Sequence, residues 1–281
     1  MQQRHTEADR RPRVALALSS GGARGFAHVG VIKALQEAGL RVVNVTGSSM
    51  GSIMAAGYAV RGDVAELERW VLDFRARQHM RRVLPVMDPA RIIAFLDHVL
   101  EGAQFRDCAV PLAIVATDLQ RGTAVALREG PVALATFASS AMPFLHQPVR
   151  WEGRLLAEGA LSCVLPLAQA REAAADVDLV IGSMTSREQQ RLDALMTGFS
   201  SGAGRVLRGW HRHYVEFFQS RRLPVPGGDL LPDPAPPTVV ITPLLDRISA
   251  VDFHKAREAI AAGERAAAAA IGEIKALLGL S

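Results

Sequence analysis

Two glycine-rich turns contain the residues of this sequence that could perform chemistry. Ser49 lies in Gly47-Ser-Ser-Met-Gly51, a G-x-S-x-G pattern between a β-branched apolar segment and a run of small residues. A serine on a sharp strand-to-helix turn is exposed for nucleophilic attack, and bulky flanking residues would clash there. The turn would also place Ser49 at a helix N-terminus, where backbone N–H groups favour negative charge. The pattern predicts a nucleophilic serine at position 49.

The G-x-S-x-G pattern alone is weak evidence, because the chain contains it twice. Gly198-Phe-Ser-Ser-Gly202 also matches, but it follows a polar, helical segment instead of a buried strand, which disfavours it as a nucleophile turn. For Ser49 itself, a plain glycine-rich connection in a βαβ unit is the alternative interpretation. The residues around the turn must therefore decide between the two.

The second glycine-rich turn contains Gly21, Gly22 and Gly25 and follows the apolar segment 14–18. Both turns follow predicted parallel strands, so both should lie at the carboxyl edge of the sheet, where α/β folds place their sites. Glycines let the backbone approach a ligand closely and aim N–H groups at a developing oxyanion. Nucleotide phosphate binding is the competing interpretation. It is disfavoured because the turn does not match G-x-G-x-x-G and no GK[ST] follows anywhere in the chain.

A base is needed to activate Ser49, and three kinds of partner can be considered. None of the eight histidines stands at a clear strand-end turn, and all three lysines lie in helical segments. Glu158 ends a short predicted strand directly before Gly159-Ala160, and a carboxylate within about 2.6–3.2 Å could accept the serine proton. A turn carboxylate near solvent is the alternative for Glu158.

The elements that must position these residues alternate between strands and helices. Apolar runs predict strands at 14–18, 42–46, 110–117, 123–127, 154–157, 179–182 and 239–242. Helical patterns cover 26–38, 52–60, the polar-to-aromatic stretch 186–222, and the Ala-rich 252–280, while 223–237 is a Pro- and Gly-rich loop. This order predicts one α/β domain with a mainly parallel sheet at 13–281, preceded by a polar tail at 1–12.

Composition narrows the range of partners. The formal charge is only +4, lysine occurs three times and no basic block is present, so a nucleic-acid partner is not expected. The two cysteines, Cys108 and Cys163, form no CxxC pair, so neither a disulfide framework nor a Cys-rich zinc site is predicted. No apolar run is long enough to span a bilayer, and residues 1–12 do not form a secretory signal. We expect a cytoplasmic protein, with peripheral membrane contact left open.

The sequence resembles the patatin-like phospholipases, especially their bacterial single-domain members. The matching stretches are residues 16–30, 47–51, 115–118, 138–148 and 158–160. The resemblance implies a three-layer α/β/α fold with a mainly parallel sheet. It also implies a serine–carboxylate dyad that hydrolyses acyl esters of lipids or phospholipids without metal or cofactor. Ser49 would be the nucleophile, and Gly21, Gly22, Arg24 and Gly25 the oxyanion element.

The sequence departs from the family pattern at the acid. The family has Asp-Gly-Gly or Asp-Gly-Ala, whereas this chain has Glu158-Gly-Ala, and Cys163 stands where an asparagine is usual. Glutamate is competent as a base but is one methylene longer, and a displacement of about 1 Å can cost roughly 10²-fold in rate. Two hypotheses follow: a working Ser49–Glu158 dyad, or an acyl-binding or regulatory protein without efficient turnover on the same fold.

The stretch 207–222 mixes aromatic residues with arginines and could lie at a lipid surface. Its apolar face would meet lipid while Arg212, Arg221 and Arg222 meet phosphates. A helix packed on the sheet with a solvated face is the alternative. Residues 142–148 could line an acyl pocket, although a core turn explains them equally well.

Overall fold

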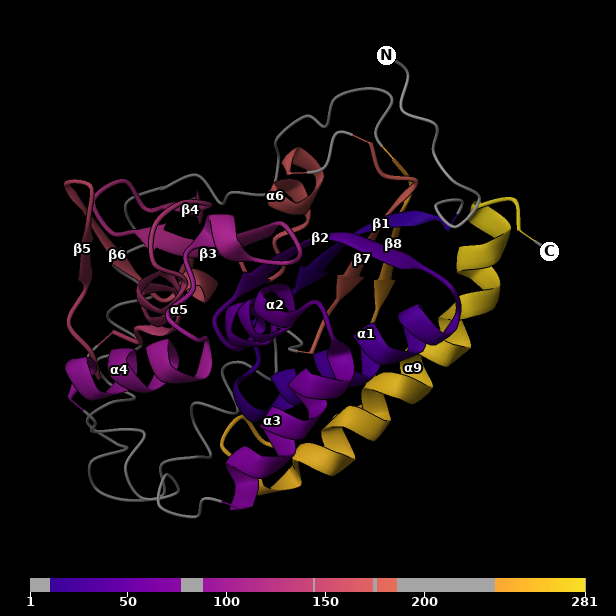
Figure 1. Cartoon of the computed structure of the whole chain (residues 1–281), viewed down its shortest axis with the longest axis horizontal. Helices are drawn as coiled ribbons and strands as arrows, with labels where there is room; N and C mark the ends of the chain where they lie inside the picture. The colour runs from indigo at the N-terminus through magenta and orange to yellow at the C-terminus, as the bar shows by residue number, and fades with distance from the viewer. Residues whose placement is uncertain (1–10, 77–87, 144, 174–175, 186–235, 281) are drawn as a thin grey trace.

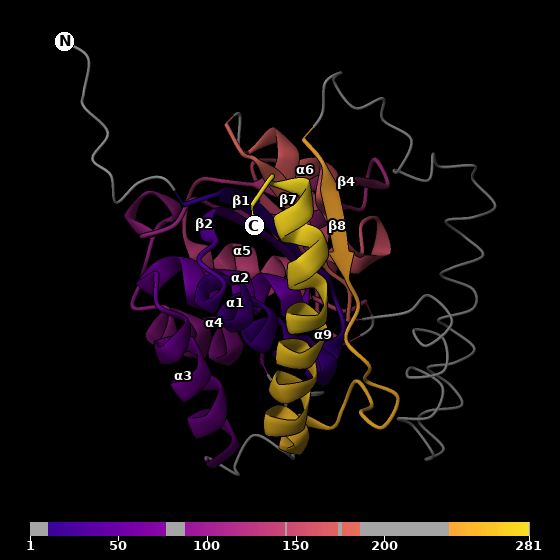
Figure 2. The same cartoon turned by 90° about the vertical axis from the view of Figure 1, so that its right-hand side faces the viewer.

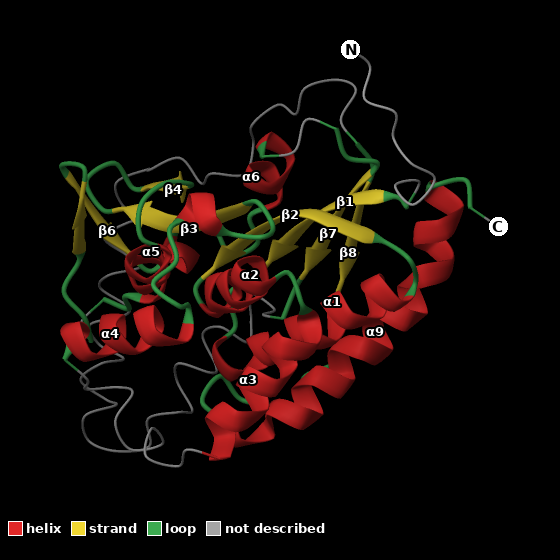
Figure 3. Cartoon of the chain, viewed as in Figure 1, coloured by secondary structure: helices red, strands yellow, loops and turns green. Residues whose placement is uncertain are grey.

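The computed structural model describes residues 11–76, 88–143, 145–173, 176–185 and 236–280. Within them, helices flank a central sheet, as the cartoon coloured by secondary structure shows (Figure 3). The strands of this sheet are β1 (Arg13–Leu18), β2 (Arg41–Ser48), β3 (Leu112–Asp118), β4 (Thr123–Leu127), β5 (Val149–Trp151), β6 (Arg154–Ala157), β7 (Leu179–Ser183) and β8 (Thr238–Ile241).

The sheet is mainly parallel. Its strands follow the order β5-β6-β3-β2-β1-β7-β8, and the pairs β3-β2, β2-β1, β1-β7 and β7-β8 are parallel. β4 and β6 each pair antiparallel with β3, and β5 pairs antiparallel with β6. The central strands are continuous apolar runs because parallel strands of this kind are covered on both faces.

Helices cover both faces of the sheet (Figure 1). Alternate side chains of β1 point to opposite faces: Val14, Leu16 and Leu18 join the large core, whereas Ala15 and Ala17 pack on the side of α6. The large core lies under the layer that contains α1, α2, α5 and α9. The helices are α1 (Ala27–Glu37), α2 (Met50–Arg61), α3 (Val64–Ala76), α4 (Pro89–Val99), α5 (Val132–Ser140), α6 (Leu167–Glu172) and α9 (Ala256–Leu277).

The predicted α/β/α class is confirmed, and the strand predictions agree with the structure to within two residues at each end. The predicted C-terminal helix 252–280 begins later, at Ala256, because the 3₁₀ helix η7 (Phe253–Lys255) precedes it. The helices α3, α4, α5 and α6 and the short strand β5 were not predicted. The Gly198–Gly202 pattern, the stretch 186–222 and most of the predicted loop 223–237 lie outside the described residues.

The parallel register places the two glycine-rich turns side by side. Leu18, the last residue of β1, is paired with Gly47 near the end of β2, and Ser48 is paired with Val115 of β3. The chain therefore leaves β1 and β2 at the same edge of the sheet, as predicted. Figure 2 shows α9 running along the helical layer beside α1. Of the helices in the described ranges, none combines the length and the apolar character needed to cross a bilayer.

Candidate active site

The turn at Ser49 has the geometry of a nucleophile turn. Ser49 connects β2 directly to α2 and has φ 54° and ψ −124°, a left-handed backbone conformation that is costly for a residue with a side chain. A Cβ on Gly47 would overlap the carbonyl oxygen of Gly51, and a Cβ on Gly51 would overlap that of Leu18 and lie 2.5 Å from that of Ser19. The predicted strand–turn–helix context is therefore confirmed, and both flanking glycines are sterically required.

Two serines fix the backbone on either side of the turn. The N–H of Ser49 donates to Ser139 Oγ at 2.8 Å, and Ser139 is fully buried in α5. The carbonyl of Ser49 accepts from the N–H of Ser52 at 2.8 Å and from its Oγ at 2.6 Å. Ser139 lies in a stretch that resembled the family, but its residue type did not identify this contact, because the acceptor and the amide lie 90 residues apart in the sequence.

The second turn forms the 3₁₀ helix η2 (Gly22–Phe26) between β1 and α1. The N–H of Ala23 donates to Ala250 O at 2.8 Å, and the N–H of Arg24 donates to Gly21 O at 3.3 Å. Within the described ranges, the N–H groups of Gly21 and Gly22 donate to no protein acceptor. These two amides are half-buried in the turn and are available to a ligand.

Arg24 anchors the glycine turn to the loop before α9. Its side chain is buried, and Nε donates to Ile248 O at 2.6 Å. Burial lowers the pKa of the guanidinium, while the carboxylates of Asp246 and Asp252 act in the opposite direction. The resemblance placed Arg24 in the oxyanion element, and the observed contacts of its side chain are structural.

Contacts between the two turns depend on glycines, at which no Cβ would fit. A Cβ on Gly25 would overlap the Met50 side chain, which starts α2 directly after Ser49. Gly51 packs against the backbone of Leu18 and Ser19, where the second turn begins. Gly21, Gly22 and Gly25 thus lie in the turn that adjoins the Ser49 turn.

Glu158 follows β6 and caps the 3₁₀ helix η6 (Gly159–Leu161), with its Oε1 accepting from the N–H of Ala160 at 3.3 Å. Its side chain is only 7% exposed, so the alternative of a carboxylate near solvent is wrong. The burial arises because β6 pairs antiparallel with the end of β3. Thr117 Oγ1 donates to Glu158 O at 2.8 Å, and the N–H of Glu158 donates to Ala141 O at 2.9 Å.

The turn that contains Glu158 packs against the Ser49 turn. A Cβ on Gly159 would overlap Val115 O and would lie 2.7 Å from Ser48 Oγ and 3.1 Å from Ser139 Oγ. Ser48 Oγ donates to Cys163 O at 2.8 Å, so the position where the family has asparagine contributes a backbone carbonyl here. Ser48, which precedes Ser49, and Gly159, which follows Glu158, therefore lie next to each other.

His28 has a structural position behind the glycine turn. Its Nε2 lies 2.8 Å from Ser19 O, and its Nδ1 lies 2.8 Å from Ser183 Oγ. Since a carbonyl can only accept, we assign the proton to Nε2, so that Nδ1 accepts from the Ser183 hydroxyl. Burial lowers the pKa of His28 to about 4, against a weaker opposing effect of the Ser19 bond, so the ring is neutral near pH 7.

The other histidines give Ser49 no partner in the described part of the chain, where no histidine forms a hydrogen bond to it. His98 and His254 are exposed. His146 packs edge-on against Phe137, with 5.5 Å between the ring centroids, and burial lowers its pKa. The described residues also contain no group of three or more His, Cys, Asp or Glu side chains arranged to hold a metal ion.

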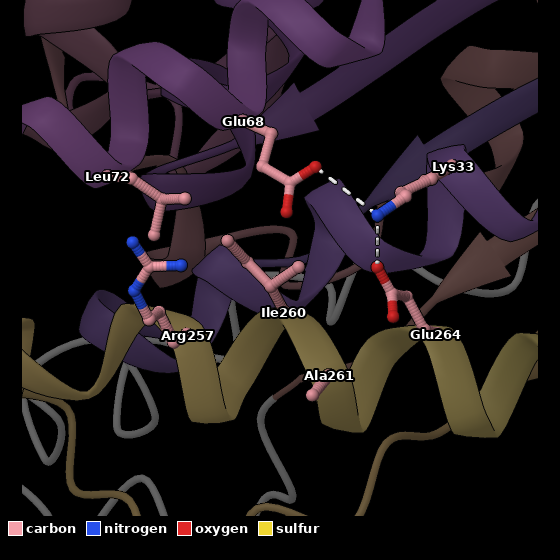
Figure 4. A pocket seen from close by; sticks show the side chains of 7 residues that line it. All are labelled: Lys33, Glu68, Leu72, Arg257, Ile260, Ala261 and Glu264. Carbon is pink, nitrogen blue, oxygen red and sulfur yellow. Dashed lines mark hydrogen bonds and ion pairs between the residues drawn. The ribbon is translucent and has the colours of Figure 1, made fainter.

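A hollow of about 200 Å³ lies among α1, α3 and α9, and Figure 4 shows its lining. Lys33 forms ion pairs there with Glu68 at 3.4 Å and Glu264 at 2.9 Å (Figure 4). The residues that line it are Lys33, Glu68, Leu72, Arg257, Ile260, Ala261 and Glu264. None of them belongs to either turn or to the Glu158 segment, so this hollow is distinct from the candidate active site.

The chain is similar to known proteins over more than half of its length. The family model for patatin-like phospholipases matches residues 16–171. An uncharacterized NTE family protein of Mycobacterium bovis is 38% identical over 192 residues, covering 65% of this chain and 52% of its own length. Lysophospholipase nte1 of Emericella nidulans is 30% identical over 209 residues, covering 70% of this chain and 13% of its own length. The chain thus spans about half of the first relative and a small part of the second.

Among solved structures, human GIVD cytosolic phospholipase A2 in complex with methyl gamma-linolenyl fluorophosphonate and terbium chloride aligns with a TM-score of 0.49. The two share 13% sequence identity, and the alignment covers 99% of this chain and 61% of the other. The family match includes both glycine turns, the Ser139 helix and Glu158, and it extends over more than half of the sequence. The chain belongs to the patatin-like phospholipase family.

Proposed function

We propose that this chain hydrolyses acyl esters of lipids through a dyad of Ser49 and Glu158. One observation carries the proposal: the strained Ser49 turn packs directly against the glycine turn on one side and the Glu158–Gly159 turn on the other. Strained non-glycine residues cluster at functional sites, because surrounding structure must hold them in place. The family membership supports the same class of reaction.

In the proposed reaction, the Glu158 carboxylate accepts the proton of Ser49 Oγ as this oxygen attacks the ester carbonyl. The carbonyl oxygen becomes an oxyanion, and the N–H groups of Gly21 and Gly22 donate to it. Collapse of the tetrahedral intermediate breaks the ester bond, and protonated Glu158 gives its proton to the leaving alcohol. Water then attacks the acyl-enzyme with Glu158 as base, which releases the fatty acid and restores Ser49.

Lipid esters are the proposed substrates, and lysophospholipids are the first class to test, because one relative is named as a lysophospholipase. Peripheral contact with a lipid surface is part of the same proposal. Flotation of the protein with vesicles that contain anionic phospholipid tests it. Recovery of the protein only in the bottom fraction would contradict it.

The alternative function is acyl binding without turnover, and it is favoured by one observation, the glutamate at a position where the family has aspartate. A longer acid in a site held this tightly could be misplaced by enough to abolish proton transfer. This alternative predicts that the fold and the serine turn are intact while Ser49 is unreactive.

The deciding experiment is labelling with a fluorophosphonate probe, followed by mass spectrometry of the adduct. Wild type is compared with Ser49→Ala, Glu158→Gln and Glu158→Asp. We expect an adduct on Ser49 in wild type, none in Ser49→Ala, and labelling at least 10²-fold slower in Glu158→Gln. An unreactive wild type together with a reactive Glu158→Asp variant would overturn the hydrolase proposal in favour of acyl binding.

A further inference from the structure

The backbone N–H of Ser49 requires an acceptor outside the helix that follows it. Ser49 is the N-cap of α2, so its N–H lies beyond the ladder of intrahelical hydrogen bonds. A backbone N–H that is shielded from water and unpaired is costly, and native structures almost always satisfy it. Here the acceptor is a side chain from another element, Ser139 Oγ, at 2.8 Å.

The hydroxyl of Ser139 has a fixed direction. Its proton goes to Val115 O at 2.6 Å, which leaves a lone pair of the same oxygen for the Ser49 N–H. Ser139 is 0% exposed, so bulk water does not compete for either bond. Val115 is the register partner of Ser48, the residue that precedes the nucleophile. Ser139 therefore links the Ser49 turn to the neighbouring strand at the same level of the sheet.

The same oxygen also lies beside the turn that contains Glu158. The space where a Cβ of Gly159 would stand is 3.1 Å from Ser139 Oγ and is filled by Val115 O. We propose that Ser139 is a positioning residue for the reaction: its hydroxyl holds Ser49 in the strained conformation and at a fixed distance from the Glu158 turn. This inference rests on the proposed role of Ser49.

Two consequences follow for the chemistry. The N–H of Ser49 is occupied and cannot donate to the oxyanion, so the oxyanion donors must be other amides, such as those of Gly21 and Gly22. Loss of the Ser139 hydroxyl leaves this N–H without its acceptor, and the strained φ of Ser49 then loses part of its support. Because a displacement of about 1 Å can cost roughly 10²-fold in rate, the effect should be on the chemical step and not on lipid binding.

The test compares Ser139→Ala with the matched control Ser140→Ala. Ser140 is the next residue of α5, and its Oγ donates within the same helix to Thr136 O at 2.9 Å. In Ser139→Ala we expect fluorophosphonate labelling of Ser49 to slow by 10- to 100-fold. We also expect kcat on a lysophospholipid to fall with little change in KM, and NMR-detected exchange of the Ser49 amide to accelerate at least tenfold. Ser140→Ala should resemble wild type in all three measurements.

Equal labelling rates and equal Ser49 amide exchange in the two variants would overturn the positioning role. A wild type that does not label would refute the proposed hydrolase instead, and the exchange measurement would then decide by itself whether Ser139 holds the turn. If Ser139→Ala does not fold, Ser139→Cys is compared with Ser140→Cys. The thiol is somewhat larger than the hydroxyl and is a weaker acceptor, so slower labelling is expected only at position 139.

Discussion

The two turns of the candidate site are held by different parts of the molecule. The Ser49 turn is tied down by hydroxyls of residues 48 and 139 and by the carbonyl of Cys163, all between β2 and α6. The glycine turn is held partly by the N–H of Ser20, which donates to Val164 O at 3.0 Å, and mostly by groups from the segment after β7. Ser19 Oγ accepts from the N–H of Thr185, Ala250 O accepts from Ala23, and Ile248 O accepts from Arg24.

This difference indicates that the nucleophile and the oxyanion donors depend on largely different hydrogen bonds, although the two turns also touch each other at Gly51. On the Ser49 side the bonds are neutral and come from adjacent strands and one helix, so they form wherever that half of the sheet forms. On the glycine side a buried cation and a neutral imidazole are involved: Arg24 bonds to Ile248 after β8, and His28 bonds to Ser183 at the end of β7. Changes on one side should therefore leave the other side largely intact.

The largest effect is expected where the two turns meet. Gly51→Ala would drive a Cβ into Leu18 O and to within 2.5 Å of Ser19 O, and neither backbone oxygen can give way easily. We expect the free energy of unfolding to fall by about 3 kcal/mol or more, measured by urea denaturation. Gly272→Ala in α9 is the control, since nothing lies within 4 Å of the position that its Cβ would take, and it should stabilise by up to about 1 kcal/mol. A destabilisation of Gly51→Ala below about 1 kcal/mol would contradict this contact.

Arg24→Met should damage the glycine side alone. The variant removes the donor to Ile248 O and leaves Asp246 and Asp252 without the buried cation, which should cost about 2 kcal/mol of unfolding free energy. Fluorophosphonate labelling should slow, while NMR-detected exchange of the Ser49 amide should stay as in wild type. Arg106→Met, at a side chain that is 85% exposed and pairs with an exposed carboxylate, is the surface control. Faster exchange at Ser49 in Arg24→Met would show that the two sides are coupled.

Acid should weaken the glycine side through His28. The folded state has a pKa of about 4 at this residue, against about 6.5 in the unfolded chain, so only the unfolded chain binds this proton between those values. The free energy of unfolding should therefore fall as pH decreases from 6.5, by about 1.5 kcal/mol at pH 5. Urea titrations across this range measure it, with His28→Asn lacking this contribution and His98→Asn, at an exposed position, retaining it. A pH dependence identical in wild type and His28→Asn would contradict the assignment.

The smallest expected effects come from one hydroxyl on each side. Ser48→Ala removes the donor to Cys163 O, and Thr185→Val removes the donor to Ser20 O; each should cost about 1 kcal/mol. If the two sides are independent, the double variant should lose the sum to within about 0.5 kcal/mol in urea denaturation. A larger departure from additivity would mean that the two turns are energetically coupled.

The sequence was sufficient to predict the features that depend on local pattern. Apolar runs located the buried strands, and the glycines at 47 and 51 indicated a sharp turn at Ser49 because no larger residue fits there. The position of both turns at one edge of the sheet followed from parallel pairing alone. The helix α5 was missed because residues 132–140 are apolar on nearly all sides, so no 3.6-residue periodicity marks them.

Features that depend on distant partners could not be predicted in this way. The burial of Glu158 results from antiparallel pairing of β6 with β3, and no pattern around residue 158 specifies it. The anchor of Arg24 lies 224 residues away, and the acceptor for Ser49 lies 90 residues away. Whether a polar side chain is buried depends on its tertiary contacts, so residue type alone does not predict it.

The wide separation of Arg24 from its anchor has a consequence for where this protein can be cut. The family match ends at residue 171, before β7, β8 and α9. A fragment ending there would keep every motif residue, yet it would lack Thr185, Ile248 and Ala250, and β1 would lose its partner β7. Residues 16–171 are therefore not expected to fold by themselves. A fragment of residues 16–171 would expose β1 as a sheet edge. It would also leave the glycine turn without the contacts that hold it.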